Sequence, residues 1–483
     1  MSGIDSAMML AILPELLILL VAAVVLLTDL VVHDNKCPRL LGWLTVGGLA
    51  VTMVASLAFA RPPQEGAAVW GGMLRHDWLA FVFQMVFILG AAVTALFAMD
   101  IENLGRRGEF YILLLASTLG MSLMAAANDL VMLYLAIETA SIPMYILVGF
   151  LHADRKSTEA GFKYLLFGAM ASSVMLYGFS LLYGFTGTTR LAALPQAIAE
   201  SGMSAGVLGA IVVLILTGFA FKTSVVPLHF WAPDVYQGAP TPVTGFLSTA
   251  SKAAGFAVLM RVFMAALPEA SMPYWAAALA AISVATMTLG NTLAIAQKDI
   301  KRMLAYSSIA HAGYILVGLV ALNELGITGV VFYLGVYLLS NLVAFGVVAM
   351  VEKADGSTEI ADYAGLGKRS PWLALALMVA LLSLSGTPPF GGFVGKAWLF
   401  GAAVKADLVW LAIVGVLNSV VAMYYYIVVF KVAYFDPPKK EGKIAVSTSY
   451  TIGLTVLAVA VLLVGIAFAP WFAWAQKAAA VLF

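Results

Sequence analysis

Cysteine and charge are the two things this sequence has least of. Its 483 residues include one cysteine, Cys37, and only 11% are charged, against roughly 25% in an average soluble domain. A single cysteine excludes a disulfide within the chain and a four-cysteine iron–sulfur site supplied by the chain alone. Because a Gly-rich nucleotide fingerprint is missing as well, the sequence indicates no redox chemistry of its own.

The charge that is present is nearly balanced. The formal net charge is +1, so no overall field draws the chain to nucleic acid, and we expect no nucleic-acid partner. The N-terminus, MSGIDSAMML, lacks the cationic segment of a secretory signal. The first apolar run contains Pro14 and Glu15 and continues to Val32, so we expect it to be retained as a membrane span.

The sequence is rich in long apolar runs. Hydrophobic residues make up 63% of the chain, and the mean hydropathy is +0.99. A bilayer offers no partner to backbone N–H and C=O groups, so spans must be helices or closed barrels, and apolar runs of about 20 residues select helices. The predicted fold class is an all-α polytopic membrane protein with about fourteen transmembrane helices. The expected spans are 8–32, 40–60, 78–99, 110–127, 130–151, 161–185, 207–231, 241–264, 274–296, 303–321, 326–351, 371–403, 408–431 and 447–470.

Basic residues in the connecting loops predict the orientation. Loops after odd-numbered spans contain fifteen Lys and Arg residues, Lys36, Lys301 and Arg302 among them, whereas the opposite face contains five. By the positive-inside rule the richer face is cytoplasmic. Because the number of spans is even, we expect both termini outside.

Prolines interrupt two of the expected spans. In the seventh span, Pro227 has no N–H to donate to the carbonyl four residues earlier. In the twelfth, Pro388 and Pro389 leave the carbonyls of Leu384 and Ser385 without their helical donors. Free backbone groups at membrane depth are tolerated only where protein or a wet cavity surrounds them.

The two interruptions lie five spans apart, so the two broken helices run in opposite directions. Broken segments at matching positions are typical of inverted repeats and indicate the ion path. We expect two inverted five-helix repeats, formed by spans four to eight and nine to thirteen. The expected division is 1–108 for an N-terminal three-helix segment, 109–265 for the first repeat, 266–434 for the second repeat and 435–483 for the C-terminal span.

Six of the 26 Lys and Arg residues fall inside expected spans. Arg261 and Lys431 are near span ends, where a long side chain can reach the headgroups, and we expect them to do so. Lys252 lies eleven residues after Thr241, about 17 Å along a helix, which is close to the bilayer midplane. A charge there costs about 2.5–3.5 kcal/mol or more, so it needs a partner or a function. The intramembrane lysines of interest are Lys163, Lys222, Lys252 and Lys396.

Glu138 is the one acid deep within a span, and we pair it with Lys222 as a hypothesis. Each charge would be expensive alone, and a proton on a neighbouring lysine would strengthen or weaken the pair. The alternative is a static salt bridge that only holds helices together.

His229 and His311 are the histidines within or at the edge of spans. An imidazole can pass protons near neutral pH. As alternatives, the two could ligate a single haem, or His229 could be a satisfied interfacial residue. The sequence predicts no metal site.

Several motifs resemble a known family, the antiporter-like subunits shared by respiratory complex I and the multisubunit cation/proton antiporters. They are ETASIPMY around Glu138, FKTSVVPLHFWAPDVYQGAPTPV from Phe221, SKAAG at Ser251, NTLAIAQKDIKRMLAYSSIAHAGYI from Asn291 and GTPPFGGFVGK from Gly386. The resemblance extends from about residue 110 to 434. Lys396 disfavours subunit M of complex I, where a glutamate is expected, and the short stretch after the last span disfavours subunit L.

This resemblance implies roles for particular residues. Glu138 and Lys222 look like a coupling pair with Lys163 as its modulating neighbour. Lys252 looks like the central lysine, and Lys396 like the lysine that faces the next channel. His229 and His311 look like relay residues between them.

The resemblance also implies a function and partners. We expect a non-redox subunit of NADH:quinone oxidoreductase in a bacterial cytoplasmic (inner) membrane, moving protons outward while electrons pass from NADH to quinone elsewhere. No cofactor is expected on this chain; NAD, FMN, iron–sulfur clusters and quinone belong to other subunits. The implied partners are subunit M and the small membrane subunits K, J and A. The alternatives are a subunit of a multisubunit cation/proton antiporter, a hydrogenase-linked relative and a structural scaffold.

Overall fold

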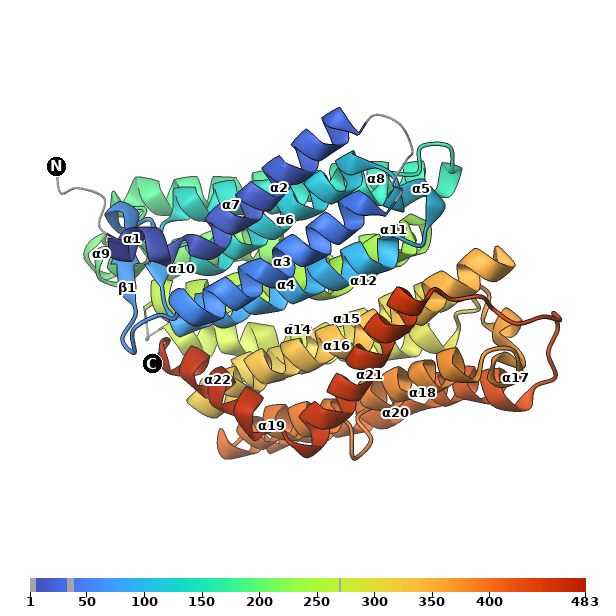
Figure 1. Cartoon of the computed structure of the whole chain (residues 1–483). Coiled ribbons are helices and arrows are strands. Elements are labelled where there is room, and N and C mark those ends of the chain that lie inside the picture. The colour runs from blue at the N-terminus through green and yellow to red at the C-terminus, as the bar shows by residue number, and fades with distance from the viewer. Residues whose placement is uncertain (1–5, 33–38, 269–270) are drawn as a thin grey trace.

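The structure is a computed structural model that describes residues 6–32, 39–268 and 271–483. His33, Lys36 and Cys37 lie outside the described residues. Long helices lie side by side along one axis, and α1 and the C-terminal helix α22 are at the same end of the bundle (Figure 1).

Helices make up nearly the whole described chain. The first half contains α1 Ser6–Ala11, α2 Leu13–Val31, α3 Leu40–Phe59, α4 Trp78–Ala98, α5 Glu102–Gly105, α6 Gly108–Ala126, α7 Leu130–Val148, α8 Arg155–Thr186, α9 Leu194–Glu200, α10 Ala205–Thr223 and α11 Trp231–Gly238. The second half contains α12 Thr241–Phe246, η3 Leu247–Ser251, α13 Lys252–Arg261, η4 Val262–Ala266, α14 Met272–Ile295, α15 Ile300–Val320, α16 Glu324–Asp355, α17 Leu366–Arg369, α18 Pro371–Ser385, α19 Gly391–Lys405, α20 Val409–Phe435, α21 Thr448–Ile466 and α22 Ala469–Ala480. The short segments η1 Trp70–Gly72, η2 Leu191–Ala193 and η6 Ile360–Tyr363 and the antiparallel strands β1 Ala67–Val69 and β2 Leu74–His76 complete the list.

The predicted polytopic fold is confirmed. Among the described residues, thirteen helices are long and apolar enough to cross a membrane. The twelfth expected span is divided into α18 and α19, each of 15 residues. Together these account for the fourteen expected spans. Side chains cap several of the helices, as Asp129 does at α7 and Asp299 at α15, where backbone N–H groups would otherwise lack acceptors.

Both predicted interruptions are present and share one local geometry. Helix α10 ends at Thr223, Ser224 takes the left-handed conformation (φ 58°), and α11 begins at Trp231. Helix α18 ends before Gly386 (φ 85°), and α19 begins at Gly391. The Val226–Pro227 and Pro388–Pro389 peptide bonds are cis.

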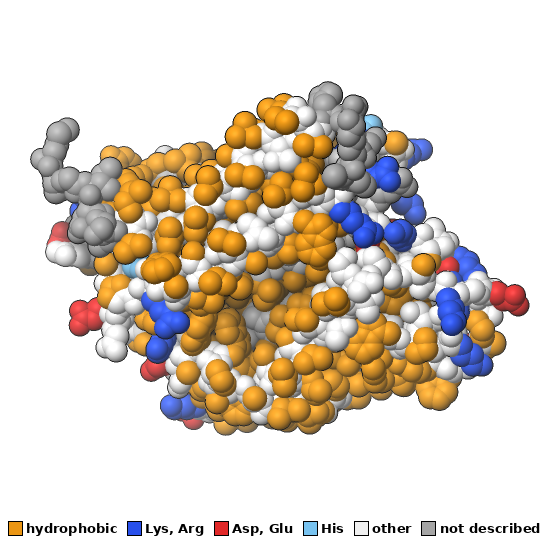
Figure 2. Space-filling view, viewed as in Figure 1, with side chains coloured by type: hydrophobic (Ala, Val, Ile, Leu, Met, Phe, Trp, Pro, Cys, Tyr) orange, Lys and Arg blue, Asp and Glu red, His pale blue; other side chains and the backbone are white. Residues whose placement is uncertain are grey.

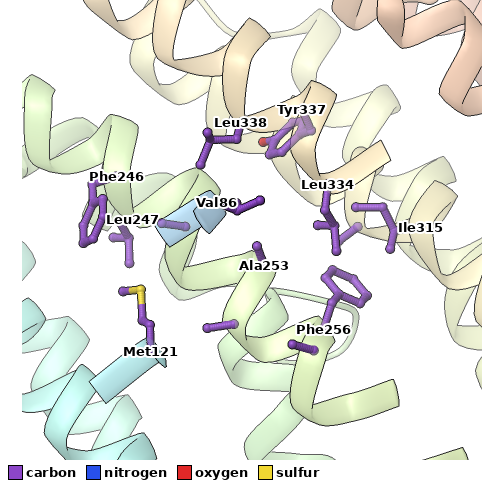
Figure 3. Close-up of a cluster of buried hydrophobic side chains, with 14 of the residues drawn as sticks. Val86, Met121, Phe246, Leu247, Ala253, Phe256, Ile315, Leu334, Tyr337 and Leu338 are labelled. Atoms are coloured by element: carbon purple, nitrogen blue, oxygen red, sulfur yellow. The ribbon is translucent and has the colours of Figure 1, made fainter. Parts of the chain in front are cut away.

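The eighth span is enclosed by protein on all sides. It combines α12, η3, α13 and η4, and its most apolar window is completely buried. Two π-helical stretches interrupt it, one immediately before Lys252 and one immediately after Arg261. Figure 3 shows apolar side chains such as Val86, Met121 and Phe256 around Ala253, so that side of the helix packs in an apolar environment.

Arg261 does not reach the headgroups, and that prediction is wrong. Its side chain is 4% exposed and its two terminal nitrogens bond both carboxylate oxygens of Asp77 at 2.8 and 3.0 Å. The guanidinium also donates to the carbonyl of Ala125 at 2.9 and 3.2 Å. Asp77 caps α4 directly after the β1–β2 hairpin, so a buried ion pair joins the eighth span to that cap.

The outer surface of the helix bundle has the distribution of apolar and charged side chains that is expected of a membrane protein. Figure 2 shows apolar side chains over the flank of the bundle and charged side chains towards its two ends. Helices α2, α3, α20 and α21 leave much of their apolar surface exposed, with 22 to 33% of their most apolar windows buried, whereas α15 and α16 are 94% buried. The core is therefore centred on α16 and the eighth span.

Candidate functional site

Glu138 and Lys222 face the same small cavity, but they do not form a direct ion pair. The cavity lies between α7, α8 and α10, and Ser141 and Ser172 also line it. Lys222 is 7% exposed and donates to the Ser141 hydroxyl at 2.8 Å. Glu138 accepts a hydrogen bond from Ser172. Among the ion pairs of the described residues none joins Glu138 to Lys222, so the static salt bridge is not formed in this state.

Lys163 belongs to a different charge cluster from the one expected. Its ammonium pairs with Glu159 at 2.8 Å and with Asp234 at 2.7 Å, and Arg302 takes the other Asp234 oxygen at 2.6 Å. Asp234 lies on α11, the short helix after the first interruption. Sequence reasoning missed it, because an acid next to a proline at an expected span end looks like an ordinary loop residue.

A polar cavity of about 1110 Å³ opens near this cluster, and Lys301, Arg302 and Glu352 are among its lining residues. Lys301 and Arg302 were predicted to lie in a loop, but they occupy the first turn of α15. Lys301 is 2% exposed, donates to the carbonyl of Ala239 at 2.7 Å and lies 3.6 Å from Glu352. The expected helix start was three residues too late, so this buried lysine was missed.

Lys252 is held by one serine. Its side chain is 2% exposed, and Nζ donates to the Ser308 carbonyl at 2.7 Å and to its hydroxyl oxygen at 2.5 Å. Ser308 lies in the middle of α15. The sequence predicted a buried lysine here but gave no signal for its partner, because serine is common in helices that pack closely.

Lys396 binds the carbonyls that the second interruption sets free. Nζ donates to Leu384 O at 3.2 Å and to Ser385 O at 3.1 Å. These are the carbonyls that Pro388 and Pro389 leave without helical donors. The ammonium also lies 4.5 Å from the centre of the Tyr314 ring, within the range of a cation–π contact.

His311 is buried on α15, and each of its ring nitrogens has a tyrosine hydroxyl as its hydrogen-bond partner. Nδ1 is 2.6 Å from the Tyr333 hydroxyl and Nε2 is 3.1 Å from the Tyr426 hydroxyl. His229 lies apart from this group, half-buried in the segment between α10 and α11. Within the described residues, no three His, Cys, Asp or Glu side chains form a group that could hold a metal ion.

Three of these lysines share one electrostatic property. Lys222, Lys252 and Lys396 have hydroxyls, carbonyls or an aromatic ring as partners, and within the described chain none of them forms an ion pair. An ammonium and a neutral amine can both donate to such acceptors, so neither protonation state is locked in. A permanent charge at this depth would be costly without a counterion. Fold and site together define a helical membrane protein with interrupted helices and a buried row of ionisable groups, a combination typical of ion-transport proteins.

Comparison with known proteins identifies the family. Residues 127–422 match the family described as NADH:quinone oxidoreductase/Mrp antiporter, TM. NADH-quinone oxidoreductase subunit N of Moorella thermoacetica is 43% identical over 458 residues, which cover 94% of each chain. That of Heliobacterium modesticaldum is 46% identical over 409 residues, covering 84% of this chain and 86% of the relative. The chain therefore belongs to the NADH:quinone oxidoreductase/Mrp antiporter membrane family and, within it, to the subunit N branch.

A solved structure agrees with this assignment. A chain of respiratory complex I from Thermus thermophilus with bound Aureothin has a TM-score of 0.81 and 32% sequence identity. The match covers 95% of this chain and 98% of that chain. The N-terminal and C-terminal helices outside residues 127–422 therefore also have counterparts in that complex.

Proposed function

We propose that this chain is a proton-translocating, non-redox membrane subunit of NADH:quinone oxidoreductase, which uses electron transfer in other subunits to move protons outward. The observation that carries the proposal is the set of three buried lysines with neutral partners. Each lysine can gain or lose a proton without leaving a buried counterion unpaired. Moving one charge against 100 mV costs about 2.3 kcal/mol, so the coupling must change proton affinity along this row by a similar amount.

The proposal gives each site residue a role. Glu138 and Lys222 form a switchable pair across the small cavity, with Ser141 holding the lysine when the pair is open. Lys163, which forms an ion pair with Asp234, modulates the Glu138–Lys222 pair from a distance. Lys252 is the central proton carrier, and Lys396 passes protons onward. His311 and His229 are relay groups.

We also propose the inverted repeats, with boundaries 109–265 and 266–434. In the first unit, Asp129 caps α7 and accepts a hydrogen bond from Thr189, while Leu130 N donates to Thr189 O at 2.8 Å. In the second unit, Asp299 caps α15 and accepts from Thr358, while Ile300 N donates to Thr358 O, also at 2.8 Å.

Element lengths support the same division. Helices α8 and α16 each have 32 residues and follow α7 and α15 in turn. In both units the interrupted helix comes next, with its proline three residues after the left-handed residue. The same sequence of capped helix, long helix and broken helix thus occurs twice, flanked by 1–108 and 435–483.

The partners and topology follow from this function. We propose contacts with subunit M and with the small subunits K, J and A, while NAD, FMN, iron–sulfur clusters and quinone stay in other subunits of the complex. We propose that both termini face the periplasm. This is supported by the position of α1 and α22 at the end opposite the large polar cavity, whose lining includes Lys156, Lys298, Lys301 and Lys353.

Replacing Lys252 by methionine tests the function. In membrane vesicles containing the assembled complex, we expect NADH-driven proton transport to fall roughly 10-fold or more, because a positioned proton-transfer group typically contributes 10²–10⁴-fold to its step. Lys431→Met is the matched control, since that side chain is exposed at the end of α20. Full proton transport in an assembled Lys252→Met complex would reject the proposal.

The family description also names Mrp antiporters, so a cation/proton antiporter subunit is the second candidate. Such a protein would exchange protons for cations in vesicles without NADH. We expect proton movement to require NADH oxidation and to be indifferent to an imposed sodium gradient.

A further inference from the structure

The hydroxyls of Tyr333 and Tyr426 lie on opposite edges of the His311 ring, one at each ring nitrogen. Tyr333 lies on α16 and Tyr426 on α20, and both side chains are at most 2% exposed. Each hydroxyl is in hydrogen-bonding range of one ring nitrogen, at 2.6 Å for Nδ1 and 3.1 Å for Nε2. Two rings pack against the imidazole as well, those of Tyr314 and Tyr337, with centroids 5.5 and 5.1 Å away.

A neutral imidazole in this position forces the two phenols into opposite roles. One ring nitrogen carries a hydrogen and donates, while the other has a lone pair and accepts. One tyrosine must therefore donate to His311 and the other must accept from it. No carboxylate contacts the ring among the described residues, and an imidazolium would have no counterion there.

The hydrogen bonds continue from Tyr426 to Ser307, the chain neighbour of the serine that holds Lys252. The Tyr426 hydroxyl also bonds the hydroxyl of Ser307. The next residue, Ser308, holds the Lys252 ammonium through both its carbonyl and its hydroxyl. On this side, one turn of α15 separates the imidazole from the partner of the central lysine.

Tyr333 extends the contacts towards Lys396. Its ring packs directly on Gly395, where a Cβ would overlap ring atoms. Gly395 is the chain neighbour of Lys396 on α19. The imidazole with its two phenols is therefore near both Lys252 and Lys396, and His311 interacts electrostatically with each of them.

We propose that Tyr426 and Tyr333 are proton-transferring residues, and that His311 passes the proton as a neutral ring by exchanging tautomers. Ser307 gives its hydroxyl proton to the Tyr426 oxygen, and Tyr426 gives its own to Nε2. Nδ1 releases its proton to the Tyr333 oxygen, and Tyr333 releases its own towards the unprotonated amine of Lys396. Each oxygen gains and loses one O–H bond, and the ring gains one N–H bond and loses another. One proton enters at Ser307 and one leaves at Tyr333, so no net charge forms on the ring. To reset the chain, the hydroxyls rotate and the imidazole ring turns over by about 180°, so that the nitrogen carrying the hydrogen faces Tyr333 again.

This step rests on the proposed proton-translocating function, and tyrosine-to-phenylalanine variants test it. Tyr333→Phe and Tyr426→Phe each remove one hydroxyl and keep the ring. In vesicles with the assembled complex, we expect each to lower NADH-driven proton transport at least 10-fold. The control is Tyr337→Phe, because the Tyr337 ring packs on the same imidazole while its hydroxyl bonds Asn341. The control should keep more than half of wild-type transport.

The outcomes separate this step from the function as a whole. If both tyrosine variants pump like Tyr337→Phe while Lys252→Met does not pump, the tyrosine relay is wrong and the proton-translocating function stands. If Lys252→Met pumps normally as well, the function itself is wrong.

A second measurement applies even if a tyrosine variant fails to assemble. Infrared difference spectra of the wild-type complex with isotope-labelled histidine distinguish the two neutral tautomers from the imidazolium, and His311→Gln assigns the bands. We expect a change of tautomer during turnover. A His311 ring that is an imidazolium at rest and in turnover would overturn the proposal.

Discussion

At the residue scale, the buried cations fall into two groups with different energetics. Lys222, Lys252 and Lys396 are held by neutral acceptors, whereas Arg261 has a complete bidentate carboxylate partner. Arginine stays protonated at any physiological pH, and its planar group suits two parallel hydrogen bonds. Proton transfer therefore suits the lysines, and a fixed structural role suits Arg261.

Replacing Arg261 by methionine should destabilise the protein without altering the proton path. The change leaves the buried Asp77 carboxylate with the partly exposed Arg75, at 3.2 Å, as its remaining ion-pair partner. Removing one partner of a buried pair typically costs about 3–5 kcal/mol, and Arg75 should reduce that cost. We expect a lower thermal midpoint and less assembled complex, measured by differential scanning fluorimetry and native gels. The double variant Asp77→Asn with Arg261→Met should recover part of the loss, because it removes the buried carboxylate charge that has lost its two-fold hydrogen-bond partner. Equal stability of Arg261→Met and wild type would contradict a structural ion pair.

Residue partners are also where sequence reasoning reached its limit. Lys222, Lys252 and Lys396, the acid in α7 and the buried histidine could be found from charge at apolar depth, whereas Lys301 could not, because it lies at a helix start. Their partners could not, because Ser141, Ser308, Tyr333 and Tyr426 are types that helices also use for packing. Only their spatial position distinguishes them.

At the element scale, the interruptions were predictable because proline removes a donor wherever it falls. The free carbonyls of Leu384 and Ser385 had been expected, and they accept the Lys396 ammonium. The π-helical stretches around α13 were not predictable, since no residue type marks them. The twelve-residue helix α22 was also missed, because it is shorter than a span.

The double variant Pro388→Ala with Pro389→Ala tests whether Lys396 depends on the carbonyls of Leu384 and Ser385. Alanine restores an N–H at both positions, so the carbonyls of Leu384 and Ser385 can be occupied by backbone donors. We expect Lys396 to lose its acceptors and NADH-driven proton transport to fall several-fold. Thr387→Ala, in the same segment, is the control. Unchanged transport in the double variant would show that Lys396 does not depend on the break.

We expect the stability of the β1–β2 hairpin to depend on pH through His76. Burial lowers the pKa of His76, and this outweighs the opposing effects of a backbone hydrogen bond at Arg61 and of the Asp77 charge. At a pH just below the ordinary histidine pKa, His76 therefore binds more protons when the hairpin is unfolded than when it is folded. The part of the hairpin's stability that comes from keeping His76 neutral is fully present above the ordinary histidine pKa of about 6.5, and it is lost as the pH falls through the lowered pKa of the folded state. We expect faster amide exchange in residues 67–76 at pH 5.5 than at pH 7.5 after correction for intrinsic rates, and a smaller difference in His76→Gln.

At the scale of the whole molecule, the proposed inverted repeats predict that substitutions at matching positions in the two units destabilise the protein equally. Asp129 caps α7 and accepts from Thr189, and Asp299 caps α15 and accepts from Thr358. Asp129→Ala and Asp299→Ala should each destabilise the protein by about 0.5–2 kcal/mol. Thermal midpoints measured side by side check this. A large effect at one position and none at the other would contradict the two-unit division.

The enclosed eighth span has a consequence for biogenesis. Its mean hydropathy of 1.3 is the lowest of the thirteen candidate spans, and it contains both Lys252 and Arg261. A segment of this kind is a poor substrate for one-by-one release from the translocon into lipid. Its neighbours α4, α6 and α10 precede it in the chain, but α16 is synthesised about eighty residues later. The ribosome must therefore add three more long helices, α14, α15 and α16, before this helix is fully enclosed. Any delay there leaves a partly assembled helix bundle open to quality-control proteases.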